Sequence, residues 1–145
     1  KIDGYAFYES ALVSIVIPNT VKQIEYNAFQ NCSSLQSVTL PNNMEYIGNA
    51  AFNYCEALTS INIPEGIVKI EGSTFWECNA LKSITFPSTL KRIEGHAFYH
   101  CDSLPSITIP SSVTTINHST FFCCFSLSIF LSPFFCICKA QSETK

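Results

Sequence analysis

The sequence predicts a β-rich repeat solenoid: a coil of about six 23-residue turns, with short parallel strands stacked along its axis and little helix. Two observations lead to this prediction. The same residues recur every 23 positions in one register, and each copy holds short segments of strand-like composition. Apolar residues make up 47% of the chain, which argues against disorder. The recurring residues are Phe29, Phe52, Phe75, Phe98 and Phe121; Cys32, Cys55, Cys78, Cys101 and Cys124; Leu35, Leu58, Leu81, Leu104 and Leu127; and Pro18, Pro41, Pro64, Pro87, Pro110 and Pro133.

The predicted domain boundaries follow from these positions. The solenoid is expected to span residues 1–133, and residues 134–145 form an apolar and then polar C-terminal tail. The first copy, AFYESALVSIVIP, is one residue shorter than the later copies between its Phe and its Leu, and it has no Cys. The turns are anchored at Phe7, Phe29, Phe52, Phe75, Phe98 and Phe121.

The first element of each copy is a short strand that ends in proline. In QSVTLP, TSINIP, KSITFP and PSITIP, outward and inward residues alternate and β-branched types are frequent, as in a half-buried strand. Proline ends the segment because it has no N–H for a sheet ladder. Two turn-forming residues follow, such as Asn42-Asn43 or Glu65-Gly66.

A second short extended element follows the turn, as in residues 21–24 (VKQI). Gly4, Gly72 and Gly95, with Asn49 at the equivalent place, are then expected to supply a residue with positive φ. One turn cannot bury enough apolar surface to offset the entropy lost in ordering its backbone. The turns are therefore expected to stabilise one another by stacking, which explains why the pattern repeats.

The pattern CxxLxxIxIPxxVxxIxxxAF, which covers about residues 2–133, resembles the BspA-like class of leucine-rich repeat. Its spacing, proline, Ala-Phe pair and Cys all agree with that class. The resemblance implies a curved, leucine-rich-repeat-like coil. It also implies a surface protein of host-associated bacteria or parasitic protists, in which adhesion and protein recognition are the usual roles. It implies no ligand and no binding residue.

The cysteines predict neither a metal site nor a cofactor. The cysteine of each coil is interpreted as a small buried hydrophobe stacked on its neighbours. Cys123, Cys136 and Cys138 lie near Cys124, but their spacing lacks the CxxC pairs of a structural zinc site.

The sequence also predicts no enzymatic activity. His100, Cys101 and Asp102 are the residue types of a nucleophilic triad, but triads are assembled from distant segments, and Cys101 belongs to the repeat. The sequence contains neither a phosphate-binding glycine loop nor a paired-carboxylate motif.

Two polar ladders are predicted on the outward side of the main strands. They are interpreted either as a hydroxyl-rich sheet that merely stays soluble or as a flat polar binding face, since solenoids commonly present repeated strand positions to partners. The candidate partner-binding residues of this face are Ser37, Ser60, Ser83 and Ser106, with Thr39, Asn62 and Thr85 beside them.

Aromatic residues form a further candidate surface. Trp76 and Tyr99 occupy equivalent positions in the return loops, in one row with Tyr8 and Phe122, and Tyr54 lies beside that row. The simpler interpretation is that these rings pack loop on loop. If they are exposed, Trp76, Tyr99 and Tyr54 are natural hot spots for a protein partner.

The uncharged stretch of residues 121–138 leaves three alternatives open: a membrane span, a capping terminal coil or an unstructured tail. Its length and apolarity match a membrane span. Yet Phe121, Cys124, Leu127, Phe130 and Pro133 keep the repeat phase, which predicts a terminal coil that caps the core. Phe121 and Leu127 cannot cover the preceding coil and face lipid at once. Each of these alternatives leaves an apolar end through which copies of the chain can associate.

The predicted function is a non-enzymatic protein-interaction or adhesion module that presents repeated faces of a rigid solenoid to a protein or glycan. The resemblance places it outside the cell or on the cell surface. The alternatives are an intracellular scaffold that uses the same faces and a surface protein anchored through residues 121–138. With a net charge of −3 and only 13% charged residues, the chain has no basic stripe, so nucleic acid is not an expected partner.

Overall fold

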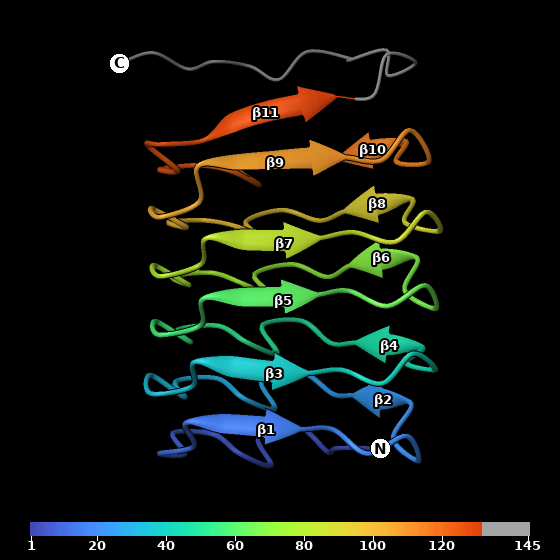
Figure 1. Cartoon of the computed structure of the whole chain (residues 1–145), viewed down its shortest axis with the longest axis vertical. Helices are drawn as coiled ribbons and strands as arrows, with labels where there is room; N and C mark the ends of the chain where they lie inside the picture. The colour runs from blue at the N-terminus through green and yellow to red at the C-terminus, as the bar shows by residue number, and fades with distance from the viewer. Residues whose placement is uncertain (132–145) are drawn as a thin grey trace.

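The computed structural model describes residues 1–131, which form a parallel β-solenoid (Figure 1). Longer strands stack on one side and two-residue strands on the other, and no helix occurs within these residues, which confirms the predicted fold class. The longer strands are β1 (Ser14–Val16), β3 (Ser37–Thr39), β5 (Ser60–Asn62), β7 (Ser83–Thr85), β9 (Ser106–Ile109) and β11 (Ser128–Leu131). The short strands are β2 (Gln23–Ile24), β4 (Tyr46–Ile47), β6 (Lys69–Ile70), β8 (Arg92–Ile93) and β10 (Thr115–Ile116).

Each strand pairs in parallel with a strand of the next coil. Ser14 lies opposite Ser37, and Ser60 lies opposite Ser83, so one step along the axis is 23 residues of chain. The main sheet runs β1-β3-β5-β7 and resumes as β9-β11, while the short strands form the two groups β2-β4 and β6-β8-β10. The sequence period is therefore the length of one coil.

The interruption between β7 and β9 has a local cause. Just before β7, the N–H of Lys82 donates to the carbonyl oxygen of Thr59 at 2.8 Å. The equivalent residue one coil later is Pro105, which has no N–H to donate. The pattern resumes where the N–H of Ser128 donates to the carbonyl oxygen of Pro105 at 3.0 Å.

A column of stacked phenylalanine rings runs through the core. Phe52 and Phe75 are fully buried, and their ring centroids lie 5.7 Å apart with an interplanar angle of 4°. The rings of Phe7, Phe29, Phe98 and Phe121 extend the column in both directions. The repeated Leu, Cys and strand residues fill the rest of the core.

The return loops correct the expectation for glycine, because no glycine has a positive φ. The positive φ falls one residue later, for example at Ser73 after Gly72. A Cβ on Gly72 would lie 2.9 Å from Nδ2 of Asn49, so this glycine leaves room for the neighbouring coil. The positive-φ residues are Tyr5, Asn27, Ala50, Ser73, His96 and Ser119, and then Glu9, Asn31, Tyr54, Glu77, His100 and Cys123.

Replacing Glu77 with glycine should stabilise the protein. The φ of Glu77 is 58°, and a left-handed backbone costs a non-glycine residue about 1–2 kcal/mol. Part of that relief is offset because glycine has more entropy in the unfolded chain, so we expect a net gain of about 0.5–1 kcal/mol in chemical denaturation. Glu56→Gly is the control, because Glu56 has no positive φ and should gain nothing. Equal effects of the two substitutions would contradict the assignment of strain.

The last strand corrects the expected place of Phe130. The 23-residue phase aligns Phe130 with Ile107, a core position, but the structure pairs Ile129 with Ile107 and Phe130 with Thr108. This 22-residue offset matches Ser128-Ile129 to Ser106-Ile107, so isoleucine aligns with isoleucine, and Ile129 is 45% exposed. A one-residue shift moves every side chain to the other face, so the Phe130 side chain is 59% exposed.

The first half of the uncharged stretch forms a coil of the solenoid. The ring of Phe121 stacks on Phe98 at 5.5 Å, and both Phe121 and Leu127 contact the core. For residues 121–131 this is the packing that the terminal-coil alternative predicts. Residues 132–138, the boundary at residue 133 and the predicted tail lie outside the described residues. Within residues 1–131, no helix has the length and apolarity needed to cross a bilayer.

Candidate interaction surfaces

The outward face of the main sheet brings the two predicted polar ladders together. Alternate residues of each strand point inward, such as Ile61, which is 4% exposed. The serines and the Thr/Asn residues on either side of these positions are exposed and aligned by the strand pairing. Thr85 donates a side-chain hydrogen bond to Asn62 in the coil before it. The exposed residues of this face are Ser37, Ser60, Ser83, Ser106, Thr39, Asn62, Thr85 and Thr108.

The return loops carry an aromatic stack. The ring centroid of Tyr99 lies 4.4 Å from that of Trp76 and 5.3 Å from that of Phe122, with the planes nearly parallel. Trp76 and Tyr99 are half-buried, as loop-on-loop packing predicts. Tyr54 is 38% exposed, and its ring takes no part in this stack. Its backbone N–H donates to the carbonyl oxygen of Trp76 at 2.8 Å.

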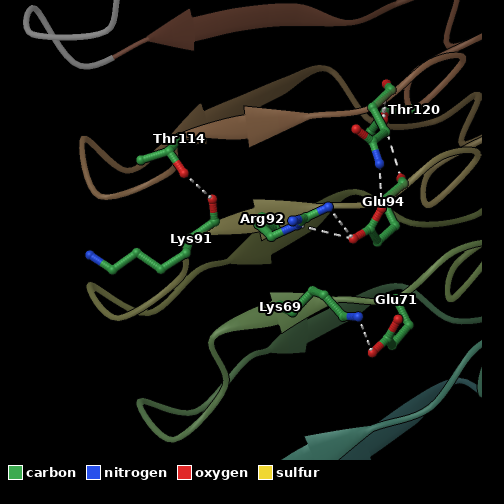
Figure 2. A network of polar contacts seen from close by, with 8 residues as sticks. Lys69, Glu71, Lys91, Arg92, Glu94, Thr114 and Thr120 are labelled. Atoms are coloured by element: carbon green, nitrogen blue, oxygen red, sulfur yellow. Dashed lines mark hydrogen bonds and ion pairs between the residues drawn. The ribbon is translucent and has the colours of Figure 1, made fainter.

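The short strands carry a network of opposite charges (Figure 2). Nζ of Lys69 lies 2.8 Å from Oε1 of Glu71, and Nη2 of Arg92 lies 3.1 Å from Oε1 of Glu94 one coil later. The hydrogen bond with Glu71 raises the pKa of Lys69. Nδ2 of Asn117 donates to the other carboxylate oxygen of Glu94. These pairs hold both carboxylates in place and neutralise their charge.

A shallow depression of about 410 Å³ lies beside this network. Sequence reasoning did not find it. The signal that could have revealed it is that one repeat position carries glycine in two successive coils, Gly72 and Gly95, between larger residues. The depression is lined by Asn49, Glu71, Gly72, Ser73, Glu94, Gly95, His96, Asn117 and His118.

The repeated thiols have a role beyond filling space. Sγ of Cys55 donates to the carbonyl oxygen of Phe29 at 3.2 Å, and Sγ of Cys78 donates likewise to Phe52 at 3.2 Å. Each thiol therefore links its coil to the preceding one. Burial raises the pKa of Cys55 and of Cys78 well above the ordinary value. The same bond recurs at Cys32, Cys101 and Cys124.

The buried thiols should resist modification in the folded protein. Thiolate is the reactive form, and Cys55 and Cys78 are buried as neutral thiols. We expect iodoacetamide at pH 8 to label them only after unfolding, whereas half-exposed Cys123 is labelled in the folded protein, as read by peptide mass spectrometry. Labelling of Cys78 in the native protein as fast as Cys123 would contradict the packing.

The residues of the nominal triad are not assembled for catalysis. Nδ1 of His100 lies 3.6 Å from Oδ1 of Asp102. Cys101, however, is fully buried, and its Sγ donates to the carbonyl oxygen of Phe75 in the core. Within residues 1–131, His, Cys, Asp and Glu side chains form no group of three or more that could hold a metal ion.

Comparison with known proteins agrees with this architecture. The family model described as BspA type leucine rich repeat region matches residues 1–128 in six copies. Among curated proteins, none matches the chain significantly.

Solved structures of bacterial leucine-rich repeat proteins are similar. A protein from Bacteroides ovatus is 38% identical over 83% of this chain and 34% of its own, with a TM-score of 0.78. The leucine rich repeat protein of T. pallidum is 32% identical over 81% of this chain and 57% of its own, with a TM-score of 0.77. A leucine rich cell surface protein from Faecalibacterium prausnitzii is 33% identical over 88% and 41%, with a TM-score of 0.63.

This chain thus spans between about a third and three fifths of the length of those proteins. The six copies of the family model agree in number with the six repeats of the sequence. The chain belongs to the BspA-type leucine-rich repeat family.

Proposed function

We propose that this chain is a non-enzymatic protein-binding module and that its binding surface is the outward face of the main sheet. The observation that carries the proposal is the pair of exposed polar ladders, which strand pairing aligns across β3, β5 and β7, with Ser106 and Thr108 of β9 exposed in the next coil. Hydroxyl groups both donate and accept hydrogen bonds, so this face offers a dense set of polar contacts.

The scaffold fixes these side chains before a partner arrives. Ser60 and Ser83 belong to strands that pair with their neighbours, and the residue that follows each of them points inward. Binding through such a face does not require a loop to become ordered, which removes one of the free-energy costs of association. A rigid, repeated face of this kind suits a partner that makes many similar contacts along the solenoid axis.

We further propose that the module acts at the cell surface. The similar protein from Faecalibacterium prausnitzii is described as a cell surface protein, which supports this location by likeness. The unpaired cysteines do not oppose it. Cys78 is fully buried as a neutral thiol, so it is protected from oxidants whichever compartment surrounds the protein.

The test adds positive charge and bulk to the proposed face. We expect the labelled wild-type chain to bind at least one member of an array of purified extracellular proteins. Ser60→Arg combined with Ser83→Arg should weaken that binding at least 100-fold while the circular dichroism spectrum stays unchanged. Two exposed side chains change, so the core is left intact.

The matched control places the same charge elsewhere. Asn42 and Ser111 are exposed in the turns, away from the main strands, and Asn42→Arg with Ser111→Arg should leave binding within about twofold of wild type. Absence of any partner on the array, or equal losses for the two double variants, would overturn the proposal.

A further inference from the structure

We propose that the depression beside the short strands is a binding site for an uncharged saccharide unit. This inference is independent of the proposed protein-binding face, because it involves other residues on another side of the solenoid. It rests on the shape of the depression, on the balance of charge along its wall and on the polar groups that remain available for a ligand.

The shape follows from one repeat position. Side chains are large at Tyr26, absent at Gly72 and Gly95, and large again at His118. A Cβ on Gly95 would lie 3.1 Å from Cε1 of His118, and one on Gly72 would lie 2.9 Å from Nδ2 of Asn49. Asn49 and His118 therefore reach over the glycine backbone from both ends.

The size of the site suits a small ligand. Neighbouring strands lie about 4.8 Å apart, so the three steps from Asn49 to His118 cover about 14 Å. The depression has a volume of about 410 Å³ and is shallow, so a small ligand bound there stays partly exposed to solvent. Because Asn49 and His118 reach inward from both ends, the space between them fits one sugar ring rather than two.

The charges along the wall are balanced within the protein. Glu71 is paired with Lys69, and Glu94 is paired with Arg92 and also accepts from Asn117 (Figure 2). The carboxylates are thus already compensated, and the site offers no net charge to select an anion or a cation. Such a wall therefore favours the binding of an uncharged ligand over that of an anion or a cation.

The remaining polar groups suit hydroxyls. Within residues 1–131, the side chains of Asn49, Ser73, His96 and His118 have no hydrogen-bond partner, although all four line the depression. A neutral imidazole and an amide each offer a donor and an acceptor, as does a sugar hydroxyl. A polyhydroxylated ring can therefore satisfy several of these groups at once.

The aromatic stack makes part of this wall rigid. The ring of His96 is stacked on Trp76 with centroids 5.3 Å apart, and its other neighbour is the ring of His118 at 5.1 Å, edge to face. These contacts restrict the rotation of His96. A side chain held before binding loses less entropy when a ligand arrives.

The test uses methyl β-glucoside, methyl β-galactoside and N-acetylglucosamine with the full chain. We expect saturation-transfer NMR to detect binding of at least one of the three, with the strongest transfer to ring protons. His118→Ala should weaken that binding at least tenfold. The side chain of His118 is exposed and has no hydrogen-bond partner within residues 1–131, so the fold should be unchanged.

The control is His100→Ala, which removes a half-buried imidazole outside the depression and should leave the signal unchanged. Ser60→Arg with Ser83→Arg should also retain saccharide binding, so failure of the protein-binding proposal is distinguishable from failure of this one. No transfer to any of the three saccharides, or equal transfer with His118→Ala, would overturn the saccharide site.

Discussion

Replacing Phe75 with alanine is expected to lower the free energy of unfolding by about 3–5 kcal/mol. Phe75 is fully buried in the middle of the ring column, with centroids of Phe52 and Phe98 at 5.7 and 5.3 Å. Removing this ring leaves a cavity between two coils that cannot collapse independently, because hydrogen bonds fix their separation. Urea denaturation followed by circular dichroism measures the change.

Phe122→Ala is the matched control for this prediction. The side chain of Phe122 is 53% exposed and stacks only on Tyr99 among the described rings. Its loss should cost about 1 kcal/mol or less. If Phe75→Ala cost no more than Phe122→Ala, the ring column would not be a main source of stability.

Gly66→Ala is expected to produce the second large effect, a loss of at least about 1–3 kcal/mol. An added Cβ would lie 2.1 Å from the carbonyl oxygen of Met44, which is a backbone atom of the preceding coil. No rotamer change can relieve that contact, so the two coils must separate. The φ of Gly66 is not positive, which means that the loss comes from the close approach of the coils rather than from backbone strain.

Gly72→Ala tests this explanation with the same chemical change. Its Cβ would meet the amide end of the Asn49 side chain at 2.9 Å and the carbonyl oxygen of Gly95 at 3.4 Å. The amide can rotate away, so the loss should stay below about 1 kcal/mol. Thermal melts that rank Gly72→Ala as the more damaging of the two would contradict the account.

The architecture was predictable because it depends on repetition. A single residue such as Phe52 does not predict a fold. An identical residue in each successive coil, however, can pack in the same way only if the coils stack in register. The strand direction, the coil length and the inward Phe, Leu and Cys positions follow from that condition. The donor role of the thiols did not follow from the repeat, since it depends on where the carbonyl oxygen of the preceding coil lies.

The two wrong predictions, the place of Phe130 and the positive φ of glycine, arose where two local preferences competed. At the last strand, the period favoured Phe130 as the partner of Ile107, but the structure matches serine and isoleucine to β9 and pairs Ile129 with Ile107 instead. In the return loops, glycine suggested a positive φ, whereas the structure gives that conformation to Ser73 and His96 and uses the glycines for close packing. Propensity alone cannot separate these two uses of glycine.

The candidate surfaces were predictable to different degrees. The polar ladders follow from the alternation of each strand, which decides the direction of Ser60 and Asn62. The depression could not be derived in the same way. It depends on how Asn49 and His118 reach over glycines one coil away, and that geometry is set by packing between coils.

The most direct test of the central claim is amide chemical-shift mapping by NMR on the isotopically labelled chain, titrated with a protein recovered from the extracellular array. The account predicts that the largest shifts fall on β3, β5, β7 and β9, at their outward serines and the Thr/Asn residues beside them. Shifts confined to the short strands or the return loops, with the main strands unchanged, would contradict the claim that the sheet face binds the partner.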